Sequence, residues 1–319
     1  MSQTDANPAR PRLTRALRLA LRIVPPLLLI AAVWVLWREF HTLSLTAVRG
    51  EMARWGPRAI VMALSLSALS FLLMGAIEWV GLRWTGARPP LAATQTGSFL
   101  ANAIAHALGA NLLIAGAIRA RFYDRYGVTL AQVAGTTLFA GVAFGVGLGA
   151  LSGAGLLLAS SADLAHTAIP PTVARILGGA LLAGAFGYVG LCALRRKPIS
   201  IFGRGLALPS FADATAQLVL GVIDNAVAAA ILWILLPTGG PPYLTFVGAY
   251  AVACIAGLAS SVPGGAGVFE SAMAALLPGI GAAALAAAFL GYRLVYYILP
   301  LIIAVAALGV EALRSGRER

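Results

Sequence analysis

Charged residues are scarce in this chain of 319 residues: Asp, Glu, Lys and Arg together make up 11% of it, whereas hydrophobic residues make up 60%. The mean hydropathy is +0.88. Apolar runs of about 20 residues, the length that crosses a bilayer, recur along the whole chain. No polar stretch is long enough to form a separate soluble catalytic domain. We therefore expect an all-α, polytopic membrane protein built as one helical bundle.

Cysteine is also scarce, and both copies, Cys192 and Cys254, fall in apolar segments. They indicate buried packing residues rather than a disulfide framework. No group of His, Cys, Asp and Glu has metal-ligand spacing, no nucleophile stands beside a base, and no glycine-rich phosphate loop follows a strand. The sequence therefore predicts no metal, no cofactor, no ATP-driven step and no enzymatic activity.

Lysine is almost absent, since Lys197 is its only copy, and the net charge of +12 comes from arginine. A basic chain often binds nucleic acid. Here, however, the arginines stand between apolar runs, where they mark cytosolic loops and contacts with anionic headgroups. We expect membrane lipids as partners and no nucleic acid.

Eight apolar segments make up a single transmembrane domain, 19–311, between basic cytosolic tails at 1–18 and 312–319. No small-residue cleavage site follows the first segment, so it is expected to stay as an uncleaved span. Pro300 is expected to kink the last segment. The segments are 19–37, 57–82, 93–118, 129–158, 171–194, 213–237, 243–279 and 281–311.

Arginine positions predict the topology, because cytosolic loops carry the excess of positive charge. If every segment up to 194 crosses once, the basic loops 119–128 and 195–212 lie outside, against this rule. If 93–118 is instead a re-entrant hairpin, five basic segments with 16 of the 23 Lys and Arg lie inside. The arginine-rich segment 38–56 remains outside and is expected to lie along the membrane interface.

A Pro-Gly-Gly sequence, Pro263-Gly264-Gly265, breaks the segment 243–279, which is too long for one span. Proline removes a backbone donor, and glycine lowers the cost of leaving helical geometry. In hydrocarbon, a broken backbone survives only where protein or a water-filled cavity satisfies its polar groups. With Gly267, these residues predict a second re-entrant hairpin, oriented opposite to the first.

Two oppositely oriented hairpins, each between flanking spans, outline an inverted repeat, which is a common plan for transporters. At an offset of 151 residues, Ile104-Ala105 overlays Ile255-Ala256, and 115–119 overlays 266–270. Arg119 then falls opposite Glu270. We expect these two residues to form a charge pair.

Ionisable residues within the apolar segments are candidate site residues, because each is costly at membrane depth without a partner or a role. A guanidinium fork also matches phosphate oxygens. The predicted substrate-binding residues are Arg119, Arg121, Asp224, Glu270, Arg293 and Tyr296, and the predicted proton carriers are Glu78 and His106. Structural alternatives stay open: positive-inside charge for the arginines, a helix cap for Glu270, and an interhelical hydrogen bond for Asp224 and for His106. Arg293 could form an ion pair with Asp224 or Glu270 inside the bundle, or snorkel to the outer headgroups.

Four segments resemble the lysylphosphatidylglycerol synthase transmembrane family, which includes the flippase domain of the multiple peptide resistance factor. They are GAIRARFY at 116–123, QLVLGVID at 217–224 with LLP at 235–237, VPGGAGVFE at 262–270, and YRLVYYILP at 292–300. The resemblance covers roughly 57–311. It implies a flippase-like membrane domain, with Glu78 standing where the family pattern implies Asp.

The synthase of that family also needs a large C-terminal acyltransferase-like region and an aminoacyl donor, whereas this chain stops at Arg319. The sequence therefore predicts translocation of a phospholipid or lipid-linked molecule in a bacterial inner membrane, with both termini in the cytosol. Two alternatives stay open: an intramembrane lipid-modifying transferase, and a non-catalytic partner of a lipid-synthesis enzyme. The oligomeric state is open in each case.

Overall fold

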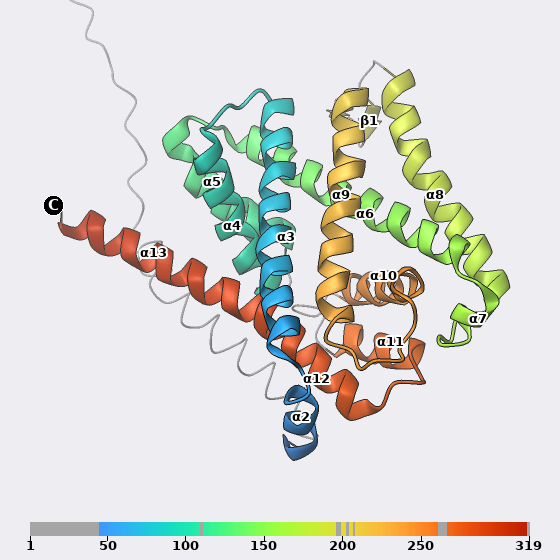
Figure 1. Cartoon of the computed structure of the whole chain (residues 1–319). Helices are drawn as coiled ribbons and strands as arrows, with labels where there is room; N and C mark the ends of the chain where they lie inside the picture. Colours follow the sequence, from blue (N-terminus) through green and yellow to red (C-terminus); the bar gives the residue numbers. More distant parts are fainter. Residues whose placement is uncertain are drawn as a thin grey trace, which may run out of the picture.

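The computed structural model describes residues 45–317, except 109–110, 196–198, 202–203, 207 and 261–266. Within these residues the fold is all-α, as predicted, apart from one short antiparallel ladder of β1 (Ile199–Ile201) and β2 (Arg204–Leu206) (Figure 1). The predicted first span, 19–37, lies outside the described residues.

Five of the described helical stretches are long and apolar enough to cross a membrane. Proline stands in the first turn of α3 and α8, where its missing N–H costs nothing. Capping boxes at Thr129 and Ser210 start α6 and α9. The five are α3 (Pro57–Trp84), α6 (Leu130–Leu158), α8 (Pro171–Leu194), α9 (Phe211–Trp233) and the combined stretch Ala282–Val310.

The last stretch is made of α12 (Ala282–Arg293), a π-helical turn (Leu294–Ile298) and α13 (Leu299–Arg317). Pro300 has no N–H for the carbonyl of Tyr296, four residues earlier, so the α-helical ladder is interrupted here. The π-helical turn therefore stands where the sequence predicts a kink.

The predicted segment 93–118 folds as a helical hairpin of α4 (Leu91–Leu108) and α5 (Asn111–Tyr123), followed by a 3-10 turn at Asp124–Tyr126. The Tyr123 hydroxyl lies 3.1 Å from the Thr94 carbonyl oxygen, so the end of α5 returns to the start of α4. Both ends lie beside the C-terminal part of α3 (Figure 1).

The predicted segment 243–279 forms a second hairpin of α10 (Tyr243–Ala259) and α11 (Val268–Leu276), which lie side by side (Figure 1). The predicted break falls between these helices, although Pro263, Gly264 and Gly265 lie outside the described residues. Gly267 precedes α11 with a φ of 80°, a backbone conformation that favours glycine. That the two hairpins are re-entrant in a membrane stays a prediction.

The helix ends gather at two ends of the molecule (Figure 1). The C-terminal ends of α3 and α8 and the N-terminal end of α9 lie at one end, together with the β ladder. The short helices α2 (Leu45–Met52) and α7 (Ser161–Leu164) lie at the other end, with the C-terminal end of α9. The basic loops after α3 and α8 therefore share one end of the fold, which is the arrangement that the arginine positions predict.

Helix α2 is anchored on the bundle rather than standing free of it. Val48 is buried against Ala286 and Ala287 of α12. The Trp55 indole N–H donates to the Leu235 carbonyl at 3.0 Å. The described part of the segment 38–56, which is predicted to lie along the membrane interface, is thus held against α12 and the residues that follow α9.

Close contacts of α6 depend on glycine. A Cβ on Gly147 would lie 2.1 Å from the carbonyl carbon of Gly221 on α9, and one on Gly153 would lie 2.8 Å from the Gly178 carbonyl oxygen on α8. Small residues allow this approach of membrane helices. The Asn225 amide adds a hydrogen bond of 3.1 Å to the Phe144 carbonyl of α6. These contacts fix α8 and α9 beside α6. The helix α9, which carries Asp224, also packs against α3.

Candidate functional site

The first buried ion pair joins α3 to α5. Arg119 donates through Nε and Nη2 to Oε2 of Glu78, at 2.9 and 2.7 Å. The Tyr123 hydroxyl donates to the other carboxylate oxygen at 2.7 Å, and Asn102 Oδ1 lies 3.4 Å from Arg119 Nη2. Both charged side chains are almost fully enclosed, at 3% and 1% exposure. A buried pair is tolerated when such added hydrogen bonds satisfy both partners.

The second buried ion pair joins α11 to α12. Glu270 Oε1 accepts hydrogen bonds from Nε of Arg293, at 2.8 Å, and from Nη2. Its Oε2 accepts the Gly267 N–H at 2.9 Å, in the first turn of α11. Glu270 therefore does both things that the sequence left open: it caps a helix and it neutralises an arginine.

The predicted pair between Arg119 and Glu270 is wrong, because each residue has its own partner. The partner of Arg119 lies on the span before its hairpin, whereas the partner of Glu270 lies on the span after its hairpin. The offset of 151 residues places Ala229 at the position of Glu78, so the repeat does not supply a matching carboxylate. Equivalent positions in a repeat are related by symmetry, and symmetry does not bring them into contact.

A mid-span cluster, which we define as Ser70, His106, Asp224 and Tyr296, lies between α3, α4, α9 and the π-helical turn. The Ser70 hydroxyl donates to Asp224 Oδ1 at 2.5 Å and lies 2.8 Å from the Tyr296 hydroxyl. Since the Ser70 proton points to Asp224, Tyr296 donates to Ser70. Ser70 stands 13 residues from the first residue of α3 and 14 from its last, which places the cluster at the middle of a span.

His106 completes the cluster from α4. Its ring centre lies 5.7 Å from that of Tyr296, 6.0 Å from that of Tyr297 and 6.2 Å from that of Phe71. Its Nδ1 is buried and has no hydrogen-bond partner within the described residues. A buried polar atom of this kind needs a water molecule or a ligand. His106 Nδ1 is therefore the atom of the cluster that a bound polar group would satisfy.

Tyrosine rings connect the second ion pair to the mid-span cluster. The Arg293 guanidinium lies 5.9 Å from the ring centre of Tyr297, and the Tyr292 ring stacks on Tyr296 at 5.4 Å. The hydroxyls of Tyr250 and Tyr292 are 3.1 Å apart. Polar and aromatic side chains thus form a contiguous interior from Glu270 to Asp224.

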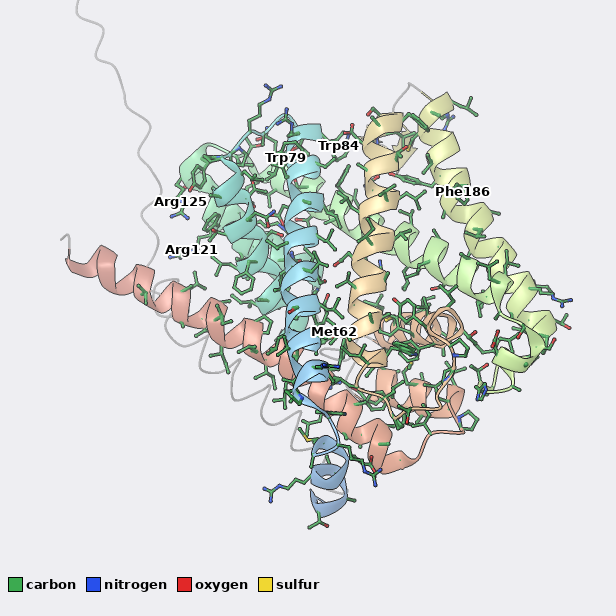
Figure 2. All side chains as sticks on the ribbon, viewed as in Figure 1. Met62, Trp79, Trp84, Arg121, Arg125 and Phe186 are labelled. Carbon is green, nitrogen blue, oxygen red and sulfur yellow. The ribbon has the colours of Figure 1, made fainter. Side chains whose placement is uncertain are left out.

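Arg121 is a predicted site residue that the fold places neither in this interior nor in a buried ion pair. It is exposed, and Figure 2 shows it with Arg125 on the outer flank of the first hairpin. The Arg125 guanidinium lies 4.1 Å from the ring centre of Phe122. This placement suits charge at a membrane surface better than a place in the mid-span cluster.

Sequence reasoning missed Ser70 and Tyr123, although a signal for Ser70 exists. Ser67, Ser70 and Glu78 are polar, sit in one apolar span and are all at most 5% exposed. A separation of 11 residues is close to three helical turns, so Ser67 and Glu78 share one face with Ser70 beside it. Polar residues on a single face of a span predict an interior polar face.

Comparison with known proteins agrees with the resemblance in the sequence. The family model of the lysylphosphatidylglycerol synthase transmembrane region matches residues 19–304 of this sequence. The uncharacterized protein slr0712 of Synechocystis sp. is 30% identical over 87% of this chain and 91% of the relative. The inner membrane protein YbhN of Escherichia coli is 29% identical over 90% of this chain and 91% of the relative.

Proposed function

This chain belongs to the lysylphosphatidylglycerol synthase transmembrane family, and we propose that it moves a phospholipid or a lipid-linked molecule between the leaflets of the membrane. Family membership connects the chain to a membrane lipid role. Five long apolar helical stretches within the described residues make it a multi-pass membrane protein. Translocation without covalent change of the lipid is the finer assignment that we propose.

The mid-span cluster is the observation that supports translocation most directly. Moving a polar headgroup through bare hydrocarbon is unfavourable, because its hydrogen bonds to water are lost. The cluster offers the remaining acceptor positions of the Ser70 and Tyr296 hydroxyls, and His106 Nδ1, which has no partner among the described residues, at the depth where that cost is greatest. Ionisable groups at this depth are retained where they serve a path for polar cargo.

Passive movement and proton coupling are both compatible with this arrangement. Glu78 accepts hydrogen bonds at both carboxylate oxygens from Arg119 and Tyr123, so protonating it would break an ion pair. Among the described residues, the Asp224 carboxylate instead accepts a hydrogen bond from a neutral hydroxyl, that of Ser70, and His106 Nδ1 has no hydrogen-bond partner. Within this proposal, Asp224 and His106 are therefore the better proton carriers.

For location, we propose the bacterial inner membrane, with the end that carries the loops after α3 and α8 facing the cytosol. The relative from Escherichia coli is named an inner membrane protein. The last turn of α3 and the loops at this end hold Arg83, Arg88 and Arg195, whereas the loop 159–170 at the other end holds no lysine or arginine. Contact with anionic headgroups at the basic end is part of the same proposal.

Translocation is tested with purified protein in liposomes of phosphatidylglycerol and phosphatidylethanolamine that carry a fluorescent, headgroup-labelled phospholipid. An impermeant reductant quenches label in the outer leaflet, so the second quenching phase reports movement from the inner leaflet. Asp224→Asn should slow this phase roughly tenfold or more, which corresponds to about 1.4 kcal/mol in the barrier. Asp213→Asn, the same change at the end of the same helix, is the matched control. A second phase no faster than in empty liposomes, for every lipid probe, would rule translocation out.

A second candidate, an intramembrane transferase, is favoured by one contact. The Ser70 hydroxyl donates to Asp224 at 2.5 Å, which is the geometry of a nucleophile beside a base. Mass spectrometry of the lipids in the same liposomes tests it. A new lipid species that Ser70→Ala abolishes, and that the control Ser65→Ala leaves, would favour the transferase over translocation.

A further inference from the structure

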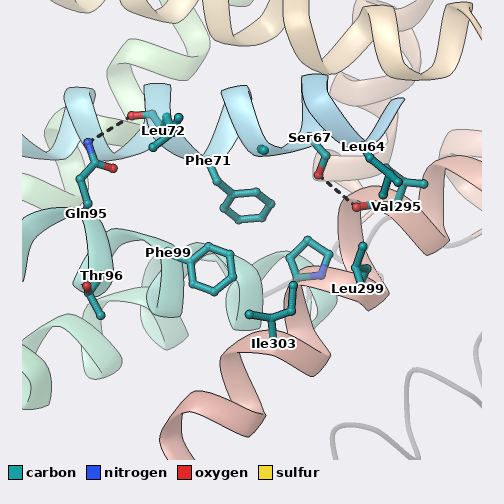
Figure 3. Close-up of a pocket in the computed structure, with 12 residues that line it drawn as sticks. Leu64, Ser67, Phe71, Leu72, Gln95, Thr96, Phe99, Val295, Leu299 and Ile303 are labelled. Carbon is teal, nitrogen blue, oxygen red and sulfur yellow. Dashed lines mark hydrogen bonds between the residues drawn. The ribbon is translucent and has the colours of Figure 1, made fainter. Parts of the chain in front are cut away.

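An apolar groove of about 480 Å³ runs between α3, α4, the π-helical turn and α13 (Figure 3). Leu64 and Leu72 of α3 line one wall, Phe99 of α4 lines the second, and Leu299 and Ile303 of α13 line the third. Its volume falls within the range of about 300–1,000 Å³ that is typical of small-molecule sites.

The groove opens toward the surroundings of the bundle rather than toward its interior. Leu72 is 57% exposed, Ile303 is 49% exposed and Leu299 is 40% exposed. Because α3 and the stretch through α13 are long and apolar enough to cross a membrane, these exposed side chains face lipid in the membrane-inserted protein. A ligand therefore enters from the hydrocarbon, sideways.

The chemistry of the wall selects hydrocarbon as the ligand. Its three polar side chains already hydrogen-bond main-chain carbonyls: Ser67 to Val295 at 3.0 Å, Gln95 to Leu72 at 3.4 Å and Thr96 to Ala92 at 2.9 Å. What remains is aliphatic and aromatic carbon. Enclosing another apolar group adds dispersion contacts to such a surface, whereas a polar headgroup would find few hydrogen-bond partners there.

The dimensions fit one acyl chain. The eight residue steps from Leu64 to Leu72 extend about 12 Å at 1.5 Å per residue. Half of the hydrocarbon core is about 15 Å thick. The groove also starts near Ser70, at the middle of α3, and extends toward the α2 end of the molecule. It therefore lies within one leaflet.

Two phenylalanine rings separate the groove from the mid-span cluster. Phe71 and Phe99 meet edge to face with ring centres 5.2 Å apart, and Figure 3 shows them facing each other between α3 and α4. The Phe71 ring centre lies 5.8 Å from that of Tyr296 and 6.2 Å from that of His106. The Phe71 ring therefore lies between an acyl chain in the groove and the His106 and Tyr296 side chains that we assign to the headgroup.

We infer that this groove binds one acyl chain of a bilayer phospholipid while its headgroup engages the mid-span cluster. The inference deepens the proposed function and rests on it for the identity of the cargo. The occupancy of the groove is a separate matter, since a chain can bind there whether or not the headgroup crosses.

The test uses full-length protein in phosphatidylglycerol and phosphatidylethanolamine vesicles that contain a phosphatidylglycerol with a diazirine near the end of one acyl chain. After illumination, mass spectrometry maps the labelled peptides. Labelling should be stronger at Leu72 of α3, Phe99 of α4 and Ile303 of α13 than on the exposed faces of α8. Ala68→Trp, which fills the groove, should lower this labelling about fivefold, as a loss of about 1 kcal/mol in binding free energy would.

Leu69→Trp is the matched control, since Leu69 is 41% exposed, stands on the same helix and does not line the groove. Leu72→Trp is a second filling variant in case Ala68→Trp folds poorly. Even labelling of all membrane-facing helices, or labelling that both filling variants leave unchanged, would overturn the inference. Groove labelling without lipid movement would instead support the groove and count against the proposed function.

Discussion

Arg119 of α5 and Glu78 of α3 form a two-point ion pair at a place where neither side chain is more than 3% exposed. The pair is 41 residues apart in the chain and ties the first hairpin to the span before it. Tyr123 shares the same carboxylate, one turn further along α5. The position of the hairpin thus depends on a charged contact inside an apolar bundle.

Arg119→Ala should therefore destabilise the protein by about 3–5 kcal/mol, because it leaves the Glu78 carboxylate buried without its counter-charge. Equilibrium unfolding of purified protein in detergent or bicelles measures this change. Arg121→Ala, two residues away and exposed, should stay within about 0.5 kcal/mol of the parent. Equal losses in the two variants would show that the pair contributes little.

The Glu270–Arg293 pair should be energetically coupled, and Arg119 and Glu270 should not be. A double-mutant cycle with Glu270→Gln and Arg293→Gln is expected to give an interaction energy of about 0.5–3 kcal/mol, because the two side chains contact each other. A cycle with Glu270→Gln and Arg119→Gln should be additive within about 0.5 kcal/mol. Coupling in the second cycle, and not in the first, would restore the pairing that the sequence repeat suggested.

Two glycines on α6 should respond to alanine in opposite directions. A Cβ on Gly147 would lie 2.1 Å from a backbone carbon of Gly221, so Gly147→Ala should cost about 1–3 kcal/mol through overpacking. A Cβ on Gly145 meets nothing within 4 Å, so Gly145→Ala should gain up to about 1 kcal/mol of helix propensity. Thermal denaturation of both variants compares them; the prediction fails if Gly147→Ala proves neutral.

Labelling with an impermeant thiol reagent tests the topology, in a background of Cys192→Ser and Cys254→Ala. Tyr126→Cys, after α5, and Arg195→Cys, after α8, should react from the same side of the membrane, which we expect to be the cytosolic side. Ser161→Cys on α7 should react only from the other side. Reaction of Tyr126→Cys and Ser161→Cys from one common side would contradict the predicted return of the first hairpin.

The sequence predicted the long helices that the structure describes, because hydrophobic runs are local signals. Capping residues, which that prediction did not use, are local signals of the same kind. Thr129 and Ser210, for example, start α6 and α9 with capping boxes that can be read from a few neighbouring residues. The family resemblance was equally accessible, since four separate segments carry it. The position of the break was predicted from Pro263 and its glycines, and α10 and α11 end and begin on either side of it.

The side-chain pairs that form between different helices could not be predicted from local sequence in the same way. Glu78 meets Arg119 and Ser70 meets Asp224 because α3 packs between the first hairpin and α9, and no local pattern encodes that packing. The pairing of Arg119 with Glu270 was predicted from a repeat offset, which identifies equivalent positions and not neighbours. Only Arg293 with Glu270 was among the pairings that charge alone suggested.

The π-helical turn changes the helical phase of the last membrane-spanning stretch. In α12 and the turn, the buried large apolar and aromatic side chains recur at Leu285, Phe289, Tyr292 and Tyr296. An uninterrupted α-helix would continue this stripe to Leu299 and Ile303, yet both are exposed, and Leu301 and Ala304 are buried instead. One inserted residue rotates the later positions by about 100°. That rotation moves Leu299 and Ile303 out of the core and makes them a wall of the groove, so the groove exists because of a single extra residue in one turn.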